Sequence, residues 1–192
     1  MRFFILFLAS IFIISCTNDY NPTVVSARKD ASEIGLKIME DGGNAFDAMI
    51  AVQLALSVSH PTAGNISGGG FMVYKLSDGS EGSLDFREKA PNSSSADMYL
   101  DEDGNVITGL SSLGGLAVGV PGTISAIFDI HEKFGLLPIE DLFKPSIELA
   151  ENGFLVTKYL EDELNEKRNV FIMMNGEAVS YTHLTLPTTS SG

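Results

Sequence analysis

The stretch GNISGGGFMVYKLSDGSEGSLDFREKAP, residues 64–91, decides the fold of this chain. Three glycines, Gly68, Gly69 and Gly70, precede a dense run of strand-forming residues, and one arginine, Arg87, follows a second such run. Glycine lets a backbone approach a ligand or another strand closely, and a guanidinium can hold a carboxylate through two parallel hydrogen bonds. The stretch therefore predicts a bare backbone beside an anion-binding side chain.

The two strand-forming runs predict a β-hairpin. Residues 71–76 form the first strand, residues 77–80 (Ser-Asp-Gly-Ser) give a turn signal, and residues 82–86 form the second strand. We expect the first strand to be mostly buried, because its residues are almost all apolar. The glycines before it do not resemble a dinucleotide-binding fingerprint, since they open no helix. They are expected to let the backbone turn tightly beside a cleft.

Strand alternation places Arg87 on the face of the hairpin that the core does not use. Leu84 and Phe86 share one face, whereas Asp85 and Arg87 share the other. Arg87 is therefore predicted to be presented to a ligand. An alternative is that Arg87 only pairs with Asp85 or Glu88, and both interpretations can hold, because a neighbouring acid can orient the guanidinium.

Helical patterns flank the hairpin on both sides. Asp30 and Glu33 stand at capping-box spacing, and Asn44 can cap a second helix that is apolar on most sides and hence expected to be buried. The expected helices cover residues 31–41, 45–58, 121–134, 138–152 and 157–168. Between residues 92 and 119 the chain is loop-like.

Length and composition indicate one ordinary domain with an apolar core. The chain has 192 residues, of which 44% are hydrophobic, and 12 basic against 25 acidic residues give a formal net charge of -13. Such a charge disfavours nucleic acid as a partner. A small anionic substrate can still bind where positive charge is local.

The first residues predict an export signal. Arg2 precedes an almost wholly apolar run, residues 3–14, which is too short for a comfortable membrane span, and Ser15-Cys16 then ends it in a pattern similar to the bacterial lipobox. We expect a signal peptide over 1–15, lipidation at Cys16, a tether over 17–29, and a protein anchored in the bacterial cell envelope or periplasm. The alternative is an uncleaved, buried apolar segment.

The sequence gives no support for a metal site or a thiol active site. Cys16 is the single cysteine, so no intrachain disulfide, zinc cluster or thiol active site is expected. His60 and His131 have no partner spacing for a metal site and are interpreted as packing or surface residues. No cofactor is predicted.

The end of the chain departs from the rest. Residues 178–192 contain no Asp, Glu, Lys or Arg and no clear element, and we expect either a disordered terminus or a segment foreign to the protein. Thr182 and His183 lie in this segment and are not assigned as a nucleophile.

Five motifs in order resemble the N-terminal part of the γ-glutamyltranspeptidase family, the glutathione hydrolases. They are Gly42-Gly43-Asn44-Ala45-Phe46-Asp47-Ala48, His60-Pro61-Thr62-Ala63-Gly64-Asn65, Gly68-Gly69-Gly70-Phe71-Met72, Asp85-Phe86-Arg87-Glu88-Lys89-Ala90-Pro91 and Val120-Pro121-Gly122-Thr123. The resemblance covers about residues 24–177, so it leaves out the export signal and the terminal segment.

The resemblance implies an α+β fold, the αββα sandwich of N-terminal-nucleophile hydrolases, here incomplete. Such proteins are precursors that cleave themselves into a large and a small subunit, and residues 30–177 would be part of the large one. A threonine at the start of the small subunit attacks the γ-glutamyl amide, with its own amine as base. The substrates implied are glutathione or other γ-glutamyl compounds.

For the site, the resemblance implies Arg87 as the clamp of the glutamate α-carboxylate. It implies no catalytic residue within this chain, so the chain alone is expected to be inactive. Two alternatives remain open: a related acylase of the same fold, and a non-catalytic lipoprotein binding module.

Overall fold

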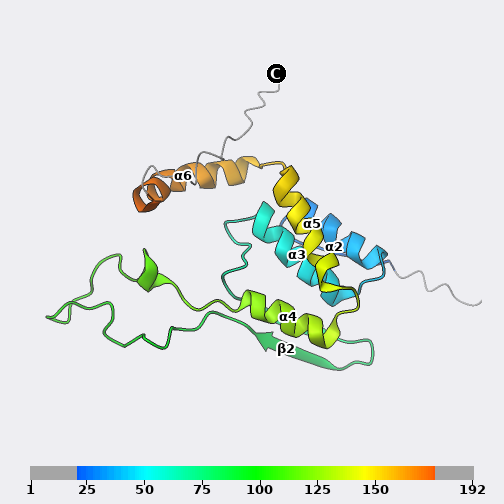
Figure 1. Ribbon diagram of the computed structural model, residues 1–192, viewed down its shortest axis with the longest axis horizontal. Helices are drawn as coiled ribbons and strands as arrows, with labels where there is room; N and C mark the ends of the chain where they lie inside the picture. The colour runs from blue at the N-terminus through cyan, green and yellow to red at the C-terminus, as the bar shows by residue number, and fades with distance from the viewer. Residues whose placement is uncertain (1–20, 176–192) are drawn as a thin grey trace, which may run out of the picture.

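A computed structural model describes residues 21–175, which form five α-helices and a two-stranded sheet (Figure 1). The elements follow in the order α2 (Lys29–Glu40), α3 (Ala45–Ser59), β1 (Phe71–Lys75), β2 (Glu81–Asp85), the short 3-10 helix η1 (Gly115–Ala117), α4 (Thr123–Phe134), α5 (Ile139–Asn152) and α6 (Lys158–Asn175). Every helix and both strands expected from the sequence are present, with some ends shifted.

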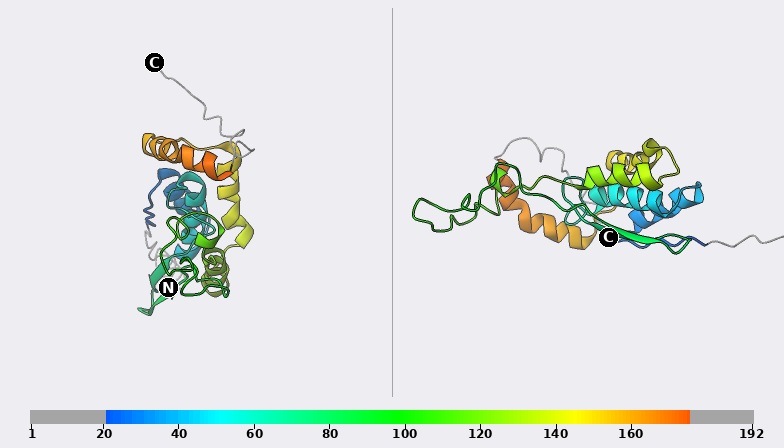
Figure 2. Two further views of the ribbon diagram at one scale, coloured as in Figure 1. Left: turned by 90° about the vertical axis from the view of Figure 1, so that its left-hand side faces the viewer. Right: turned by 90° about the horizontal axis from the view of Figure 1, so that it is seen from below.

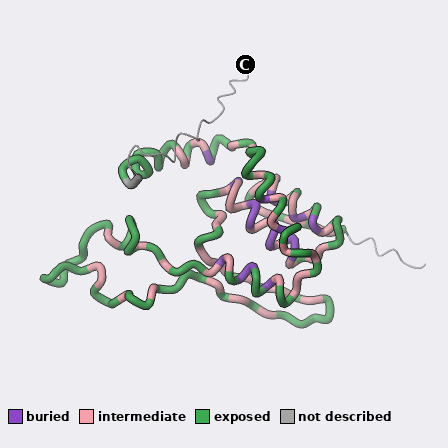
Figure 3. Tube along the Cα trace, viewed as in Figure 1, coloured by how far each residue is buried: buried purple, intermediate pink, exposed green. Residues whose placement is uncertain are grey.

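Helix α3 is the centre of the core. It contacts α2, α4 and α5, and Figure 3 shows the buried positions gathered along it and its neighbours. Ile50 and Ala51 are fully buried, and Ile127 from α4 and Leu142 from α5 join the same cluster. A helix that is apolar on all sides is stable only when neighbours cover all of it. The expectation of a buried second helix is confirmed.

Helix α2 begins at Lys29, earlier than expected, and the predicted capping box is wrong. Arg28 occupies the N-cap, and its side chain makes no cap hydrogen bond. Asp30 instead lies in the first turn, where its carboxylate accepts hydrogen bonds from Arg28, Ala31 and Ser59. Burial by itself would raise the pKa of Asp30, but these donors outweigh it and lower that pKa below its ordinary value.

The segment predicted as a tether, residues 17–29, is described from residue 21 and is anchored at its end. The Arg28 guanidinium donates to the carbonyl oxygen of Leu155 at 2.8 Å and lies 5.7 Å from the centre of the Phe154 ring. Arg28 thus ties the start of α2 to the linker between α5 and α6.

The hairpin packs against the helices through one face. Phe71 lies opposite Asp85 and Met72 opposite Leu84, so the register follows the predicted alternation. The expectation that the first strand is mostly buried is wrong, because Phe71 is 67% and Val73 82% exposed. Among the described residues, helices cover only the inner face of the hairpin (Figure 2).

A long irregular segment joins β2 to α4 and extends away from the helices (Figure 1). Helix α4 then begins at Thr123 instead of Pro121, and α6 continues past Arg168 to Asn175. Gly135 and Gly153 follow the last residues of α4 and α5, as predicted. No helix in the range 21–175 combines the length and apolar character that crossing a bilayer requires.

Asn44 and Asp47 link the start of α3 to the end of α4. Asn44 caps α3 as predicted, and the Asp47 carboxylate accepts a hydrogen bond from the Asn44 backbone N–H at 2.9 Å. The Asn44 side chain donates to the carbonyl oxygen of Phe134, and the backbone N–H of Leu136 donates to the carboxylate of Asp47. Asp47 is completely buried, and its carboxylate needs these donors because water cannot hydrate it.

We predict that Asp47→Ala lowers the free energy of unfolding by about 2 kcal/mol, because the capping box of α3 and the link to Leu136 both lose their acceptor. Asp41→Ala is the control, since Asp41 forms an exposed pair with Lys37 and its loss should cost less than about 0.5 kcal/mol. Urea denaturation followed by circular dichroism compares the two variants. Equal midpoints would contradict the role of Asp47.

Candidate functional site

Arg87 emerges directly after β2 and is exposed. Its guanidinium carbon lies 5.5 Å from the centre of the Phe71 ring, which belongs to the opposite strand. A guanidinium over an aromatic face is attracted to the ring while its N–H groups stay available. No carboxylate within residues 21–175 forms an ion pair with Arg87.

Asp85 and Glu88 do not orient the Arg87 guanidinium in the way the sequence suggested. The Asp85 carboxylate accepts a hydrogen bond from the backbone N–H of Arg87 at 3.0 Å. A short acidic side chain readily bonds to the backbone two residues further on, and here this outcompetes the side-chain pair. Glu88 makes no ion pair in the described part of the chain. Asp85 therefore holds the backbone of Arg87, and Phe71 lies against its side chain.

The three glycines lie where the chain packs closely against neighbouring atoms: Gly69 against backbone, and Gly68 and Gly70 against side chains. None of Gly68, Gly69 and Gly70 has a positive φ. A Cβ atom on Gly69 would lie 2.6 Å from the Cα atom of Arg87, and one on Gly70 would lie 2.9 Å from the Phe86 ring. The predicted bare backbone beside the arginine is thus present, although its cause is proximity and not a tight turn.

Gly122, directly before α4, approaches the same segment. A Cβ atom on Gly122 would lie 2.1 Å from the carbonyl oxygen of Phe86. Lys89 and Val120 form two backbone hydrogen bonds, at 3.1 and 2.8 Å, and extend this contact. The backbone at Phe86–Arg87 therefore lies against two glycine-containing segments.

Asn65 and Thr123 connect these two segments, and sequence reasoning missed both. The Asn65 Oδ1 atom accepts hydrogen bonds from the Thr123 hydroxyl at 2.6 Å and from the backbone N–H of Gly68 at 3.0 Å. In return, the carbonyl oxygen of Gly68 accepts from the backbone N–H groups of Gly122 and Thr123. Each ends a quoted motif directly after a glycine, so a polar residue in that position was the available signal.

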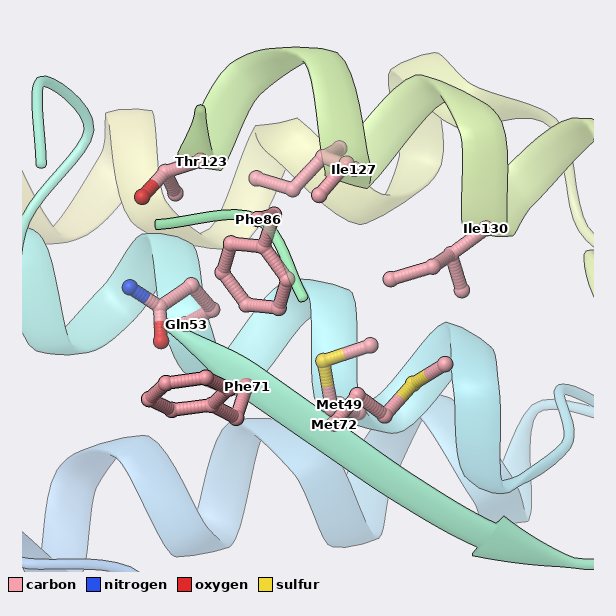
Figure 4. Close-up of a pocket in the computed structure, with 9 residues that line it drawn as sticks. Met49, Gln53, Phe71, Met72, Phe86, Thr123, Ile127 and Ile130 are labelled. Carbon is pink, nitrogen blue, oxygen red and sulfur yellow. The ribbon is translucent and has the colours of Figure 1, made fainter. Parts of the chain in front are cut away.

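A small apolar cavity lies on the inner side of Phe71 (Figure 4). Phe86 projects into the space between α4 and β1, and Gln53 and Thr123 give it a polar end. The lining residues are Met49, Gln53, Phe71, Met72, Phe86, Thr123, Ala126, Ile127 and Ile130. Phe71 thus has the cavity on one side and the Arg87 guanidinium nearby.

The remaining candidate residues add no second site. His131 Nε2 lies 2.8 Å from the carbonyl oxygen of Leu137, and His60 caps the end of α3 through its backbone. Residues 21–175 contain no group of three or more His, Cys, Asp or Glu side chains that could hold a metal ion. Cys16, Thr182 and His183 lie outside the described residues.

The family model for γ-glutamyltranspeptidase matches residues 31–186. The chain belongs to the γ-glutamyltranspeptidase family. The match contains Arg87 and all five motifs, and it extends into residues 178–192, whose foreign origin stays a prediction.

Known family members agree with this assignment. The glutathione hydrolase proenzyme of Pseudomonas sp. (strain A14) is 52% identical over 136 residues, which are 71% of this chain and 24% of that protein. The crystal structure of Helicobacter pylori γ-glutamyltranspeptidase matches with a TM-score of 0.79 at 43% identity, covering 84% of this chain and 46% of that one. The chain thus spans about a quarter of the length of its curated relative.

A cephalosporin acylase shares the fold. The structure of this enzyme from Bacillus halodurans matches with a TM-score of 0.67 at 27% identity, covering 83% of this chain and 31% of that one. Together with the γ-glutamyltranspeptidase match, it confirms that the helices and hairpin are part of an N-terminal-nucleophile hydrolase fold.

We predict that Gly122→Ala in this γ-glutamyltranspeptidase chain lowers the free energy of unfolding by about 1–3 kcal/mol, because a Cβ atom there collides with a backbone carbonyl. Gly115→Ala is the matched control, since a Cβ atom on Gly115 meets nothing within 4 Å. Thermal denaturation measures both. A Gly122→Ala variant as stable as Gly115→Ala would show that the close contact is not a constraint.

Proposed function

We propose that the precursor containing this chain is a γ-glutamyltransferase and glutathione hydrolase. In this proposal Arg87 binds the α-carboxylate of the γ-glutamyl group. The observation that carries it is the guanidinium of Arg87, which is exposed, lies over Phe71 and has no ion-pair partner within residues 21–175. The names of the relatives support the substrate class, since the Pseudomonas protein is a glutathione hydrolase proenzyme.

Recognition of the α-carboxylate suits an arginine held in this way. A planar, permanently charged fork distinguishes a carboxylate from an amide better than lysine does, because two parallel N–H groups match two oxygens. The chain carries a formal net charge of -13, so a local cation is needed to bind an anionic substrate. The Asp85 carboxylate is occupied by the Arg87 backbone, which leaves the guanidinium free for substrate.

The chemical step is proposed to use residues outside this chain. A threonine at the start of a small subunit attacks the γ-glutamyl carbonyl, and its own amine takes the hydroxyl proton. The amide C–N bond then breaks, the donor's amine leaves with that proton, and water or an acceptor amine releases the glutamyl group from the threonine oxygen. Because the chain spans about a quarter of its curated relative, we expect it to be inactive alone. Cleavage of the precursor supplies the threonine and makes the small subunit its partner.

The precursor expressed from the complete reading frame tests this function. We expect it to split into two bands on a denaturing gel and to release chromophore from γ-glutamyl-p-nitroanilide. An intact, inert product would refute the enzyme and favour a non-catalytic binding module. The cephalosporin acylase match supports a second candidate, an acylase for another side-chain amide. Cleavage of an acyl amide that lacks the α-carboxylate, without cleavage of the γ-glutamyl anilide, would favour it.

We predict that Arg87→Lys in the precursor raises KM for the γ-glutamyl anilide by roughly 10- to 100-fold, because the loss of a charged bidentate contact costs about 1.5–3 kcal/mol. Precursor cleavage should be unchanged. Arg168→Lys in α6 is the matched control and should leave KM as it was. Steady-state kinetics decide, and an unchanged KM for Arg87→Lys would refute the clamp.

We also propose export and lipid anchoring at Cys16, with the protein in the bacterial cell envelope. We predict that Cys16→Ser moves the protein from the detergent phase to the aqueous phase in Triton X-114 partition, because the acyl chains supply the membrane affinity. Cleavage and activity of the detergent-free protein should persist. Identical partition of both proteins would refute the anchor.

A further inference from the structure

Two glycines lie against the backbone at Phe86 and Arg87. A Cβ atom on Gly69 would lie 2.6 Å from both the Arg87 Cα atom and the Phe86 carbonyl oxygen, and one on Gly122 would lie 2.1 Å from that same oxygen. The placement of these two glycine segments therefore restricts where the Arg87 Cα atom lies.

The side chains of Asn65 and Thr123 link these two glycine segments. The Thr123 hydroxyl, on a residue that is 1% exposed, donates to Asn65 Oδ1 at 2.6 Å, and the same oxygen accepts from the backbone N–H of Gly68. The carbonyl oxygen of Gly68 accepts from the backbone N–H groups of Gly122 and Thr123 at 2.9 and 3.1 Å. The four hydrogen bonds form a closed circuit from residue 65 to the start of α4.

The circuit is fixed to the core helix. The side-chain amide of Gln53, on α3, donates to the carbonyl oxygen of Asn65 at 3.0 Å. Hydrogen bonds that satisfy one another favour a single geometry, because breaking one leaves its partner group unsatisfied. The two glycine segments next to Arg87 are thereby linked to α3.

We propose that Asn65 and Thr123 are positioning residues for Arg87. They hold Gly69 and Gly122 at the spacing that directs the guanidinium over Phe71 and towards the substrate carboxylate. The inference rests on the proposed function, in which Arg87 binds the α-carboxylate. It assigns a task in substrate binding to a half-buried residue, Asn65, and a buried one, Thr123.

The first test uses Thr123→Val in the precursor from the complete reading frame. This variant keeps the shape of the side chain and removes the hydroxyl. KM for γ-glutamyl-p-nitroanilide should rise roughly 3- to 10-fold, as expected for one buried hydrogen bond, with kcat within about twofold. Thr123→Ser should restore KM. The control, Ser146→Ala, removes a buried hydroxyl that donates to Phe143 within α5 and should change neither constant.

The second test asks whether the effect passes through Arg87. Adding Thr123→Val to Arg87→Lys should raise KM less than about twofold further, because the contact that the pair positions is already lost. With 4-aminobutyryl-p-nitroanilide, which lacks the α-carboxylate, Thr123→Val should have no effect on kcat/KM. An equal loss with both anilides, a fall in kcat alone, or no loss at all would overturn the proposal.

A third measurement needs no enzymatic activity. Phenylglyoxal modifies exposed arginines, and mass spectrometry of the peptide that contains Arg87 gives its rate. The rate should rise about twofold or more in Thr123→Val and Asn65→Leu, because the guanidinium is released from Phe71. It should stay unchanged in Ser146→Ala and in Asn65→Asp, which keeps the accepting oxygen. If the wild-type precursor cleaves no γ-glutamyl anilide, the proposed function fails, and this rate alone decides the positioning role. Equal rates in all variants would overturn it.

Discussion

The site depends on contact between backbones without side chains in between. Residues 68–70, 86–88 and 119–122 lie against one another so closely that a methyl group at Gly69 or Gly122 would overlap its neighbour. Backbone hydrogen bonds between Gly68 and the start of α4, and between Lys89 and Val120, complete the contact. A side chain that leaves such a place has little freedom at its base, so the reach of Arg87 is fixed by the fold.

The helical core carries this contact. Helix α3 contributes Ala48, Ile50, Ala51 and Leu54 to the core cluster. It is linked to α4 at one end by Asn44 and Asp47, and to the glycine segment by Gln53. Shifts of α4 along α3 are therefore opposed at both ends. The segments that surround Arg87 are therefore each linked to α3.

Local patterns in the sequence predicted the elements well, and contacts between distant segments less well. Strand alternation and the turn at Gly79 predicted the hairpin and the face on which Arg87 lies. Asn44 predicted the start of α3. The burial of β1 was overestimated, because strand-forming residues such as Val73 do not reveal whether a second layer covers their outer face. The capping box at Asp30 failed because Arg28 and Ser59 compete for the same carboxylate.

For the site, residue type identified Arg87 and the glycines, but not what holds them. The pair Asn65–Thr123 is separated by a long stretch of chain, and nothing local marks one residue as the partner of the other. The orienting role given to Asp85 and Glu88 came from proximity in sequence. In the structure, the aromatic ring across the hairpin lies against the guanidinium instead.

The residues of the hydrogen-bond circuit around Arg87 are synthesised early. All of its members lie between Gln53 and Thr123, and the helix that anchors it precedes the hairpin along the chain. Chains emerge from the ribosome from the N-terminus, and early segments can fold before later ones exist. The residues that surround Arg87 are therefore all synthesised before α5, whose Leu142 completes the core cluster around α3.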